Sequence, residues 1–205
     1  DTINIVDGKG ALYNCKIIKL ERQECYATIL NKNNNFNNKH YKVHIAISCL
    51  KNHERMEWFV EKAVELGVDK ISFLNCKRTI RNKVKIERLN KIAIVAMKQT
   101  LKTKLPIIDG VLDIYDFISK IDDNNRFICH LEDELNNSIF NYKNKFTKNK
   151  SSCILIGPEG DFTKNEISLA ENKSFISITL GTNRLRSETA GVVACHLLNI
   201  INNYR

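Results

Sequence analysis

The chain has 205 residues, of which 43% are hydrophobic, enough for one large domain or two small ones with a buried core. This composition excludes a disordered chain. Lys and Arg number 32 against 23 Asp and Glu, so the formal charge of +9 favours a polyanionic partner, although an A/T-rich genome would also add lysines. No apolar run reaches the roughly 18 residues of a membrane span. The first residues have no signal-peptide pattern, so we expect a cytoplasmic protein.

The cysteines are odd in number, contain no CxxC pair and mostly lie in apolar stretches. We therefore expect buried, reduced thiols, with no disulfide and no metal site. The seven are Cys15, Cys25, Cys49, Cys76, Cys129, Cys153 and Cys195.

The first 40 residues have β character. Residues 2–6 and 11–20 alternate around the Asp-Gly turn at 7–10, which is a strong hairpin signal, and residues 25–30 alternate again. Residues 31–42 are polar and Asn-rich, which predicts a linker or a flexible hairpin end. We expect residues 1–40 to be part of a small β domain whose opening strands precede Asp1.

From residue 43 the pattern changes to alternating strands and helices, which predicts an α/β domain over residues 41–205 with a parallel sheet covered on both faces. Gly67 is a natural helix-ending residue, and Thr163 with Glu166 fits a capping box. We expect strands at 43–49, 70–76, 126–130, 153–156 and 175–180, and helices at 52–66, 86–101, 163–172 and from Ser187 or Thr189 to about 202.

Ligands of open parallel sheets bind beyond the carboxyl ends of the strands, so the loops that follow strands are the candidate sites. Three stand out, at residues 130–134, 157–162 and 180–190. In the second, the sequence Gly-Pro-Glu-Gly-Asp-Phe has no Cβ at Gly157 or Gly160 to keep a ligand from the backbone, although an ordinary β-to-α turn would have a similar sequence.

Several chemistries are excluded by missing motifs. The chain has no GxGxxG, no GxxxxGK[ST] and no GxSxG, which argues against dinucleotide enzymes, P-loop NTPases and α/β-hydrolases. Cys195 and His196 are adjacent on a predicted apolar helix and point about 100° apart, so we expect core or interface residues, not a catalytic dyad.

Two arginines, Arg184 and Arg186, precede the last predicted helix, where the helix dipole disfavours cations. Positive groups held against the local field indicate an anionic ligand. Glu188, by contrast, complements the dipole.

Four spaced motifs carry a resemblance to a known family. They are ELGV at 65–68, AMKQT at 96–100 with Pro106, IGPEGDF at 156–162 with Glu166, and LG at 180–181 followed by LRSETA at 185–190. Together they resemble the RsmE family, S-adenosylmethionine-dependent methyltransferases that modify N3 of a uridine in 16S (small-subunit) ribosomal RNA.

The resemblance implies a SPOUT-type fold with a C-terminal trefoil knot, a homodimer and a preceding PUA-like β-barrel domain. The chain departs from many relatives at Asp161, where they have glycine, and at Ser187, where they have threonine. The resemblance places S-adenosylmethionine among the knot loops, at Leu131, Ile156, Gly157, Gly160, Leu180, Gly181 and Leu185.

Methyl transfer to N3 of uridine requires the loss of the imide proton or stabilisation of the developing anion. We expect Arg186 to stabilise that charge or to bind an adjacent phosphate. We expect Glu188 to accept the proton or to hold Arg186, with simple helix capping as the alternative. Candidate RNA contacts are Arg78, Arg81, Arg184, and Lys98 with Lys102, which would share one helix face. For each of the two lysines, an ordinary solvated surface position is the alternative.

The expected partner is small-subunit ribosomal RNA or the assembled 30S subunit, with no membrane and no metal. Two other functions stay open. One is a different SPOUT methyltransferase that acts on transfer RNA, and the other is a non-catalytic RNA-binding or assembly protein that retains the fold.

Overall fold

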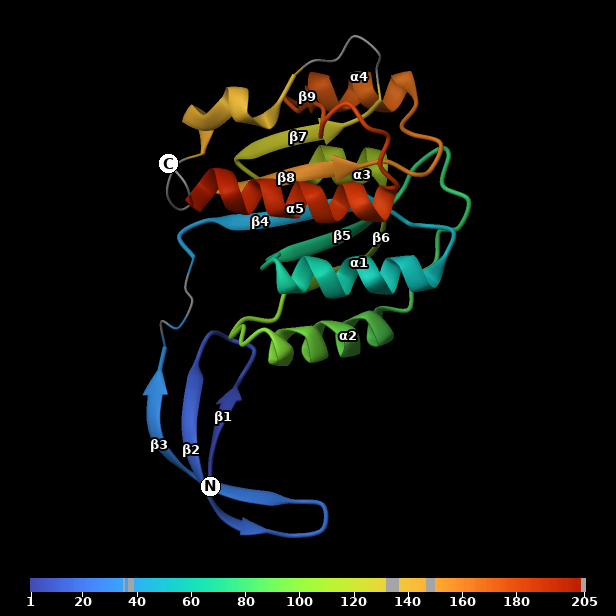
Figure 1. The fold of residues 1–205 in the computed structure, drawn as a ribbon. Coiled ribbons are helices and arrows are strands. Elements are labelled where there is room, and N and C mark those ends of the chain that lie inside the picture. Colours follow the sequence, from blue (N-terminus) through green and yellow to red (C-terminus); the bar gives the residue numbers. More distant parts are fainter. Residues whose placement is uncertain (35, 37–38, 132–136, 147–149, 204–205) are drawn as a thin grey trace.

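The computed structural model describes residues 1–34, 36, 39–131, 137–146 and 150–203. A three-stranded antiparallel sheet projects from a larger α/β body (Figure 1). No helix in these ranges is both long and apolar enough to span a membrane. The elements are β1 (Thr2–Val6), β2 (Leu12–Leu20), β3 (Cys25–Asn33), β4 (Lys42–Ser48), α1 (His53–Glu65), β5 (Lys70–Asn75), α2 (Ile86–Gln99), β6 (Ile107–Asp113), α3 (Ile114–Lys120), β7 (Asn125–Cys129), η1 (Ile139–Lys145), β8 (Ser151–Ile156), α4 (Lys164–Asn172), β9 (Ile176–Ile178) and α5 (Ser187–Asn203).

The N-terminal strands pair in the order β1-β2-β3, and the hairpin predicted at residues 7–10 is present. Its turn is held by Asp7, whose Oδ1 accepts hydrogen bonds from the backbone N–H groups of Lys9, Gly10 and Ala11 at 2.8, 3.1 and 3.1 Å. The linker expected from residue 31 begins later, because β3 continues pairing with β2 as far as Asn33. Residues 35 and 37–38 of that linker lie outside the described ranges.

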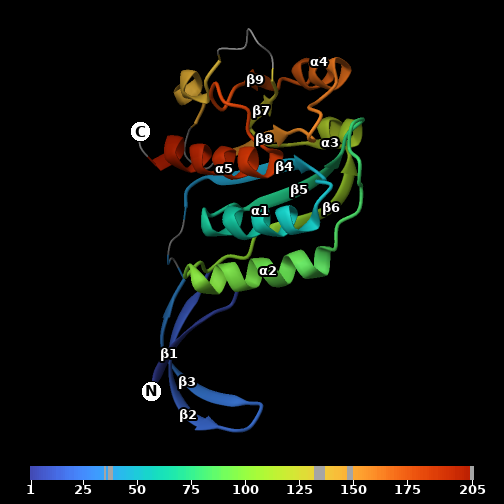
Figure 2. The same cartoon turned by 45° about the vertical axis from the view of Figure 1, so that its right-hand side comes forward.

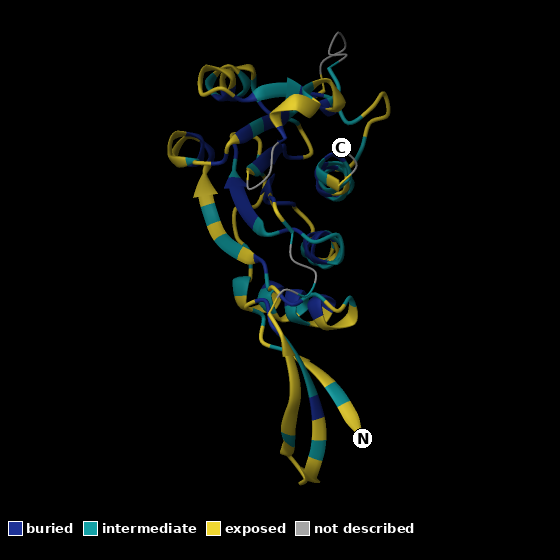
Figure 3. Ribbon diagram, turned by 90° about the vertical axis from the view of Figure 1, so that its left-hand side faces the viewer, coloured by how far each residue is buried: buried dark blue, intermediate teal, exposed yellow. Residues whose placement is uncertain are grey.

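Most of this small sheet is exposed, as Figure 3 shows. Ile18, Ile29 and Leu30 are 65%, 58% and 56% exposed, which is unusual for large apolar side chains on neighbouring strands. The sheet therefore has no core of its own among the described residues.

The α/β body contains a six-stranded sheet in the order β6-β5-β4-β8-β7-β9, and all its pairs are parallel, as the sequence predicts. Helices α1, α2 and α5 cover one face, and α3 with α4 covers the other (Figures 1 and 2). In β4, Ile45 and Ile47 face the first layer and Ala46 the second. A strand buried on both faces requires the continuous apolar run that the sequence has there.

Two elements, β6 and α3, were not predicted. Strand β6 lies at the edge of the sheet and is mostly exposed or half-buried, so its sequence contains Asp109 and Gly110 in place of an apolar run. Asp113 then caps α3 by accepting a hydrogen bond from Tyr115 N at 2.8 Å. The 3₁₀ segment η1 was also missed, and β7 and β9 are displaced or shortened by one or more residues from the predicted strands.

The predicted ends of α1, α4 and α5 are close to those observed. Asn52 caps α1 by accepting from Glu54 N at 2.8 Å, and Gly67 after it has a φ of +85°. Helix α2 ends at Gln99, earlier than predicted, since Leu101 has a φ of +51° that a helix cannot contain. The prediction that Lys98 and Lys102 share a helix face is therefore wrong, because Lys102 lies beyond the helix.

A buried polar network joins three strands of the sheet to the segment before β7. His44 Nδ1 lies 2.7 Å from Asp123 Oδ2 and His44 Nε2 lies 2.9 Å from Ser72 Oγ, while Ser72 Oγ donates to Asp109 Oδ2 at 2.6 Å. Ser72 thus links Nε2 of His44 to the carboxylate of Asp109, while Nδ1 contacts the carboxylate of Asp123.

Replacement of Asp123 by Asn tests this network. Burial acts to raise the pKa of Asp123, but the hydrogen bond and charge of His44 outweigh it and hold that pKa below its usual range. Because the folded pKa is lowered, the stabilisation is present above the ordinary carboxyl range and is lost as pH falls through the lowered value. We expect Asp123→Asn to cost about 2 kcal/mol at neutral pH, measured by urea unfolding, and progressively less on acidification.

The exposed neighbour Asp122 provides the control, and Asp122→Asn should change stability by less than about 0.5 kcal/mol at any pH. A cost for Asp123→Asn that stays constant from pH 7 to pH 3 would contradict the proposed ion pair.

Candidate active site

A cavity of about 240 Å³ opens at the carboxyl ends of β7, β8 and β9, next to the start of α5. The three loops chosen from the sequence meet there, because neighbouring parallel strands place their following loops at the same edge. Residues 132–134 of the first loop lie outside the described ranges. The cavity is lined by Arg55, Cys129, His130, Leu131, Ile156, Gly157, Pro158, Glu159, Asp161, Thr179, Leu180, Gly181, Asn183, Leu185, Arg186, Ser187 and Ala190.

Most of the residues predicted to contact a cofactor are in this wall, namely Leu131, Ile156, Gly157, Leu180, Gly181 and Leu185. Arg186 also lines it and is exposed. Gly160 does not line the cavity, and a Cβ on it would lie 3.4 Å from Cδ of Arg78. A Cβ on Gly157 would lie 3.2 Å from both Asp161 Oδ1 and the Phe162 ring, so Gly157 is the glycine that the close packing of this loop requires.

Asp161 joins two of the three loops. Its Oδ2 accepts a hydrogen bond from Leu131 N at 2.8 Å, and its Oδ1 accepts from Phe162 N at 2.8 Å. Its φ is +63°, a conformation that glycine adopts freely and that aspartate tolerates better than most residues. Asp161 thus combines a glycine-like backbone conformation with a hydrogen bond to Leu131.

Glu166 is fully buried and fixes the 157–163 loop from below. Its Oε2 accepts from Thr163 N and Thr163 Oγ1, both at 2.7 Å, so the predicted capping box is confirmed. Its Oε1 accepts from Lys77 N at 2.8 Å, which attaches the segment after β5 to the same point.

Arg78, predicted to contact RNA, also supports this loop. Its Nη1 donates to Gly160 O at 2.6 Å and to Phe162 O at 3.3 Å. Two backbone acceptors therefore hold the guanidinium, and its first function in the structure is to brace the loop.

Of the charged pair beside the cavity, Glu188 was predicted from the sequence and Arg55 was not. Glu188 is buried in the first turn of α5, and its Oε1 lies 3.5 Å from Nε of Arg55, a cavity residue that the sequence reading missed. Within the described residues the ion pair of Glu188 is with Arg55 and not with Arg186, so the expectation that Glu188 holds Arg186 is wrong for this structure.

An open concave surface of about 780 Å³ adjoins the cavity and shares Arg55 and Glu159 with it. Arg81, predicted to contact RNA, is on this surface, whose lining is Lys51, Asn52, His53, Glu54, Arg55, Ile80, Arg81 and Glu159. The exposed Arg184 neighbours the lining residues Asn183 and Leu185. Lys98 is exposed on α2 and does not line the cavity, while Lys102 lines a separate cleft between α1, α2 and the N-terminal sheet.

The cysteines carry no reactive thiol at this site. Five of the seven are buried and Cys129 is half-buried, as expected, whereas Cys25 is exposed. Burial raises the pKa of Cys129, which lines the cavity, to about 12, so its thiol stays protonated at neutral pH.

In the described ranges, one group of side chains of the types that bind metals lies close together. These are His44, Asp123 and Cys153, whose ligand atoms lie within 4.8 Å of one another. Both ring nitrogens of His44 already have hydrogen-bond partners, Asp123 and Ser72. Burial also raises the pKa of the Cys153 thiol well above its usual value. The arrangement is complete as a hydrogen-bonded network.

The fold and this site match a class of nucleic-acid-modifying enzymes. A family model described as an RNA methyltransferase domain matches residues 37–199. The chain therefore belongs to the RNA methyltransferases with this domain.

Two solved structures of RNA methyltransferases resemble this chain over most of its length. A probable rRNA-methyltransferase from Porphyromonas gingivalis is 35% identical with a TM-score of 0.90, over 100% of this chain and 87% of that one. A ribosomal RNA small subunit methyltransferase E from Neisseria gonorrhoeae, bound to S-adenosyl methionine, is 25% identical with a TM-score of 0.87, over 98% and 83%.

The ribosomal RNA small subunit methyltransferase E of Rickettsia conorii is 33% identical over 162 residues, 78% of this chain and 65% of that protein. That of Mesomycoplasma hyopneumoniae is 29% identical over 181 residues, 86% and 77%. The chain spans just under two thirds of the Rickettsia conorii protein. It is a member of the RsmE family.

Removal of the Glu166 carboxylate tests its place under the site. Glu166→Ala leaves the backbone N–H groups of Lys77 and Thr163 without their acceptor and should lower the free energy of unfolding by about 2 kcal/mol. Glu171 is exposed on the same helix, so Glu171→Ala should cost less than about 0.5 kcal/mol. Equal costs in denaturant unfolding would show that Glu166 does not fix the loop.

Proposed function

We propose that this chain is an S-adenosylmethionine-dependent methyltransferase that methylates N3 of a specific uridine in small-subunit ribosomal RNA. One observation carries the proposal, namely a cavity built from three strand-end loops of an RsmE-family chain, with an exposed arginine in its wall. The Neisseria gonorrhoeae relative has S-adenosyl methionine bound, which supports the choice of cofactor.

The residues present suit that cofactor. Ile156, Leu180 and Leu185 provide apolar contact for an adenine ring, while Gly157 and Gly181 expose backbone groups in the cavity wall. Gly181 has a φ of +126°, and a Cβ on it would meet no atom within 4 Å. When bound, the cofactor supplies an electrophilic methyl group, and the protein's task is to hold the uridine in line with it.

The imide proton of uridine N3 must leave before or during transfer, and two side chains suit this step. Arg186 would stabilise the negative charge that develops on the uracil. Glu188, which is buried beside the lining residue Ser187 and does not itself line the cavity, would accept the proton. Its partner Arg55, 3.5 Å away, would keep the carboxylate oriented. A helix-capping role of Glu188 does not conflict with proton transfer or with the contact to Arg55, because only one carboxylate oxygen, Oε1, faces Arg55.

The adjoining concave surface gives the RNA a place to enter. Lys51, Arg55 and Arg81 lie on it against Glu54 and Glu159, so its charged side chains have a small positive excess. Arginine guanidinium groups bind phosphate with two parallel hydrogen bonds, which would fix the orientation of the strand. We propose Arg184 and Lys98 as peripheral contacts and Arg78 as a contact made through the loop it braces.

The finer architecture is also part of the proposal. Residues 1–40 would belong to a PUA-like domain whose further strands cover the apolar face with Ile18 and Ile29, and residues 41–205 would form the SPOUT domain with a trefoil knot. The outer side of α5, where His196 is exposed beside Val193 and Leu197, would form a homodimer interface. A cytoplasmic location follows from a ribosomal RNA substrate.

Mass spectrometry of ribosomal and transfer RNA, from cells with and without the gene, tests the function. We expect one methylated uridine in small-subunit RNA to disappear in the deletion strain and to return with the complementing gene. A change confined to transfer RNA would overturn the substrate, and no change in either RNA would overturn the activity.

Arg186→Ala separates catalysis from cofactor binding. We expect methyl transfer to fall by at least about 100-fold, a typical loss for one charge-stabilising donor, while affinity for S-adenosylmethionine changes less than about threefold in calorimetry. The matched variant Arg184→Ala, just outside the cavity, should weaken RNA binding and retain the single-turnover rate. Weaker cofactor binding by Arg186→Ala with a normal single-turnover rate would remove Arg186 from the chemistry.

Gly157→Ala and Gly160→Ala compare a glycine in the wall with one outside it. Because the added methyl group of Gly157→Ala would lie 3.2 Å from Asp161 and the Phe162 ring and displace the cavity wall, this variant should bind S-adenosylmethionine about tenfold more weakly, equivalent to about 1.4 kcal/mol. Gly160→Ala places its methyl group against Arg78 and should change affinity less. A stronger effect at Gly160 in calorimetry would restore it as the cofactor-facing glycine.

A further inference from the structure

A second basic cleft, of about 690 Å³, lies at the other end of the sheet from the active-site cavity. It is formed where the N-terminal turn at Gly8 and Lys9 meets the segment after α2, the end of α1 and the start of β4. Five lysines line it against a single aspartate, Asp69, and these lysines are Lys9, Lys39, Lys42, Lys102 and Lys104.

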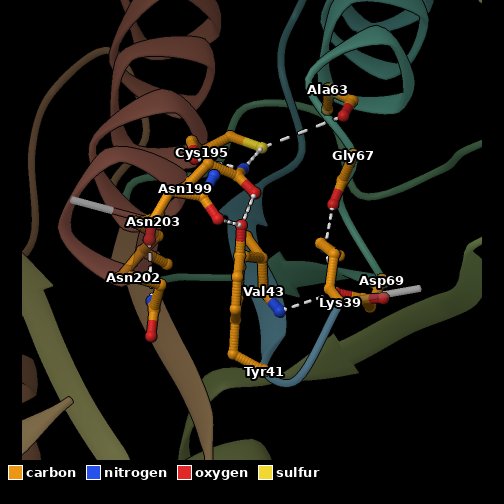
Figure 4. Close-up of polar contacts among 11 residues, drawn as sticks. Lys39, Tyr41, Val43, Ala63, Gly67, Asp69, Cys195, Asn199, Asn202 and Asn203 are labelled. Carbon is orange, nitrogen blue, oxygen red and sulfur yellow. Dashed lines mark hydrogen bonds and ion pairs between the residues drawn. The ribbon is translucent and has the colours of Figure 1, made fainter. Parts of the chain in front are cut away.

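Asp69 already has two partners, Lys39 and the backbone of Val43. Its Oδ2 lies 2.6 Å from Nζ of Lys39 and accepts a hydrogen bond from Val43 N at 2.8 Å. Lys39 also donates to Gly67 O and lies 5.0 Å from the centre of the Tyr41 ring (Figure 4). One lysine is thus neutralised and structural, and the cleft retains an excess of positive charge.

Two ammonium groups converge at Gly67. A Cβ on Gly67 would lie 3.7 Å from Nζ of Lys102 and 3.8 Å from Nζ of Lys39. Because Lys39 is paired with Asp69, Lys102 supplies the uncompensated positive charge at this point, where it would attract a bound anion. The φ of +85° at Gly67 and the missing side chain keep this point open.

The walls of the cleft are fixed by hydrogen bonds. Gly10 N donates to Thr103 O at 2.9 Å and Leu105 N donates to Gly8 O at 2.8 Å, which join the N-terminal turn to the segment after α2. On the far wall, Tyr41 donates from its hydroxyl to Asn199 Oδ1 at 2.9 Å and to Asn203 Oδ1 at 3.1 Å (Figure 4). A cleft held in this way presents its lysines in a defined arrangement.

We propose that this cleft binds the phosphate backbone of the same RNA, as a second contact remote from the reacting uridine. The inference rests on the proposed function. The lysines come from three separate segments of the chain around a cleft of about 690 Å³, which suits a chain of phosphates better than a single small anion. Lysine is a point charge without the planar fork of arginine, so the contact would add affinity with little sequence preference.

A triple variant, Lys9→Gln with Lys42→Gln and Lys102→Gln, tests the cleft and leaves the structural Lys39 in place. The matched control carries the same charge loss at the exposed Lys120, Lys164 and Lys173 of α3, α4 and the residue after it. The full chain is titrated with fluorescent, in vitro transcribed small-subunit ribosomal RNA between 50 and 200 mM salt. Thermal unfolding and S-adenosylmethionine calorimetry verify that each variant is folded.

The cleft variant should lose about two to three units from the slope of log affinity against log salt and bind at least about tenfold more weakly at 100 mM salt than the control variant. Equal slopes for the two variants would overturn the proposal. If the triple variant is unstable, Lys102→Gln alone should reduce the slope by about one unit, and an unchanged slope would overturn the proposal equally.

This readout does not need methylation. RNA that binds with the expected slopes but gains no methyl group would overturn the proposed function and leave the cleft supported. If the RNA is methylated normally and both variants bind it equally, the proposed function is supported and the cleft proposal is overturned.

Discussion

The parallel pairing of β8 with β7 and of β7 with β9 is the constraint on which the site depends. Parallel strands in register end at one edge, and the three loops that follow them have to meet there, although they are far apart in the sequence. The order β6-β5-β4-β8-β7-β9 also brings β4 beside β8, so α1, which follows β4, starts at the same edge. Arg55 thereby comes within reach of Glu188.

Two carboxylates, the half-buried Asp161 and the fully buried Glu166, then give those loops a fixed shape. Asp161 and Glu166 together accept hydrogen bonds from four backbone N–H groups and one hydroxyl, so the loops are held by their main chains. Because a buried backbone donor without an acceptor costs free energy, the loops have few alternative conformations. The side chain of Arg186 is left exposed in the cavity wall, free to meet a ligand.

Local patterns predicted the elements that are buried on both faces or end in clear caps, such as β4, α1 and the α4 capping box. They missed β6, since an edge strand needs no apolar run, and they extended α2 past Leu101, whose positive φ has no sequence signal. Arg55 was missed although a usable signal was present. It lies in the first turn of α1, where the dipole disfavours cations, and the same argument had selected Arg184 and Arg186.

Genome composition and function make different predictions about where the positive charge lies. A bias toward A and T would add lysines without regard to place. It does not explain why arginines gather at the cavity and its approach, at Arg55, Arg81 and Arg186, close to two helix N-termini that repel them. Directional guanidinium groups lie where a base would have to be oriented, while lysines line the remote cleft, where attraction to phosphate would be sufficient. The type of cation at each end of the sheet therefore corresponds to the precision that each contact with RNA would need.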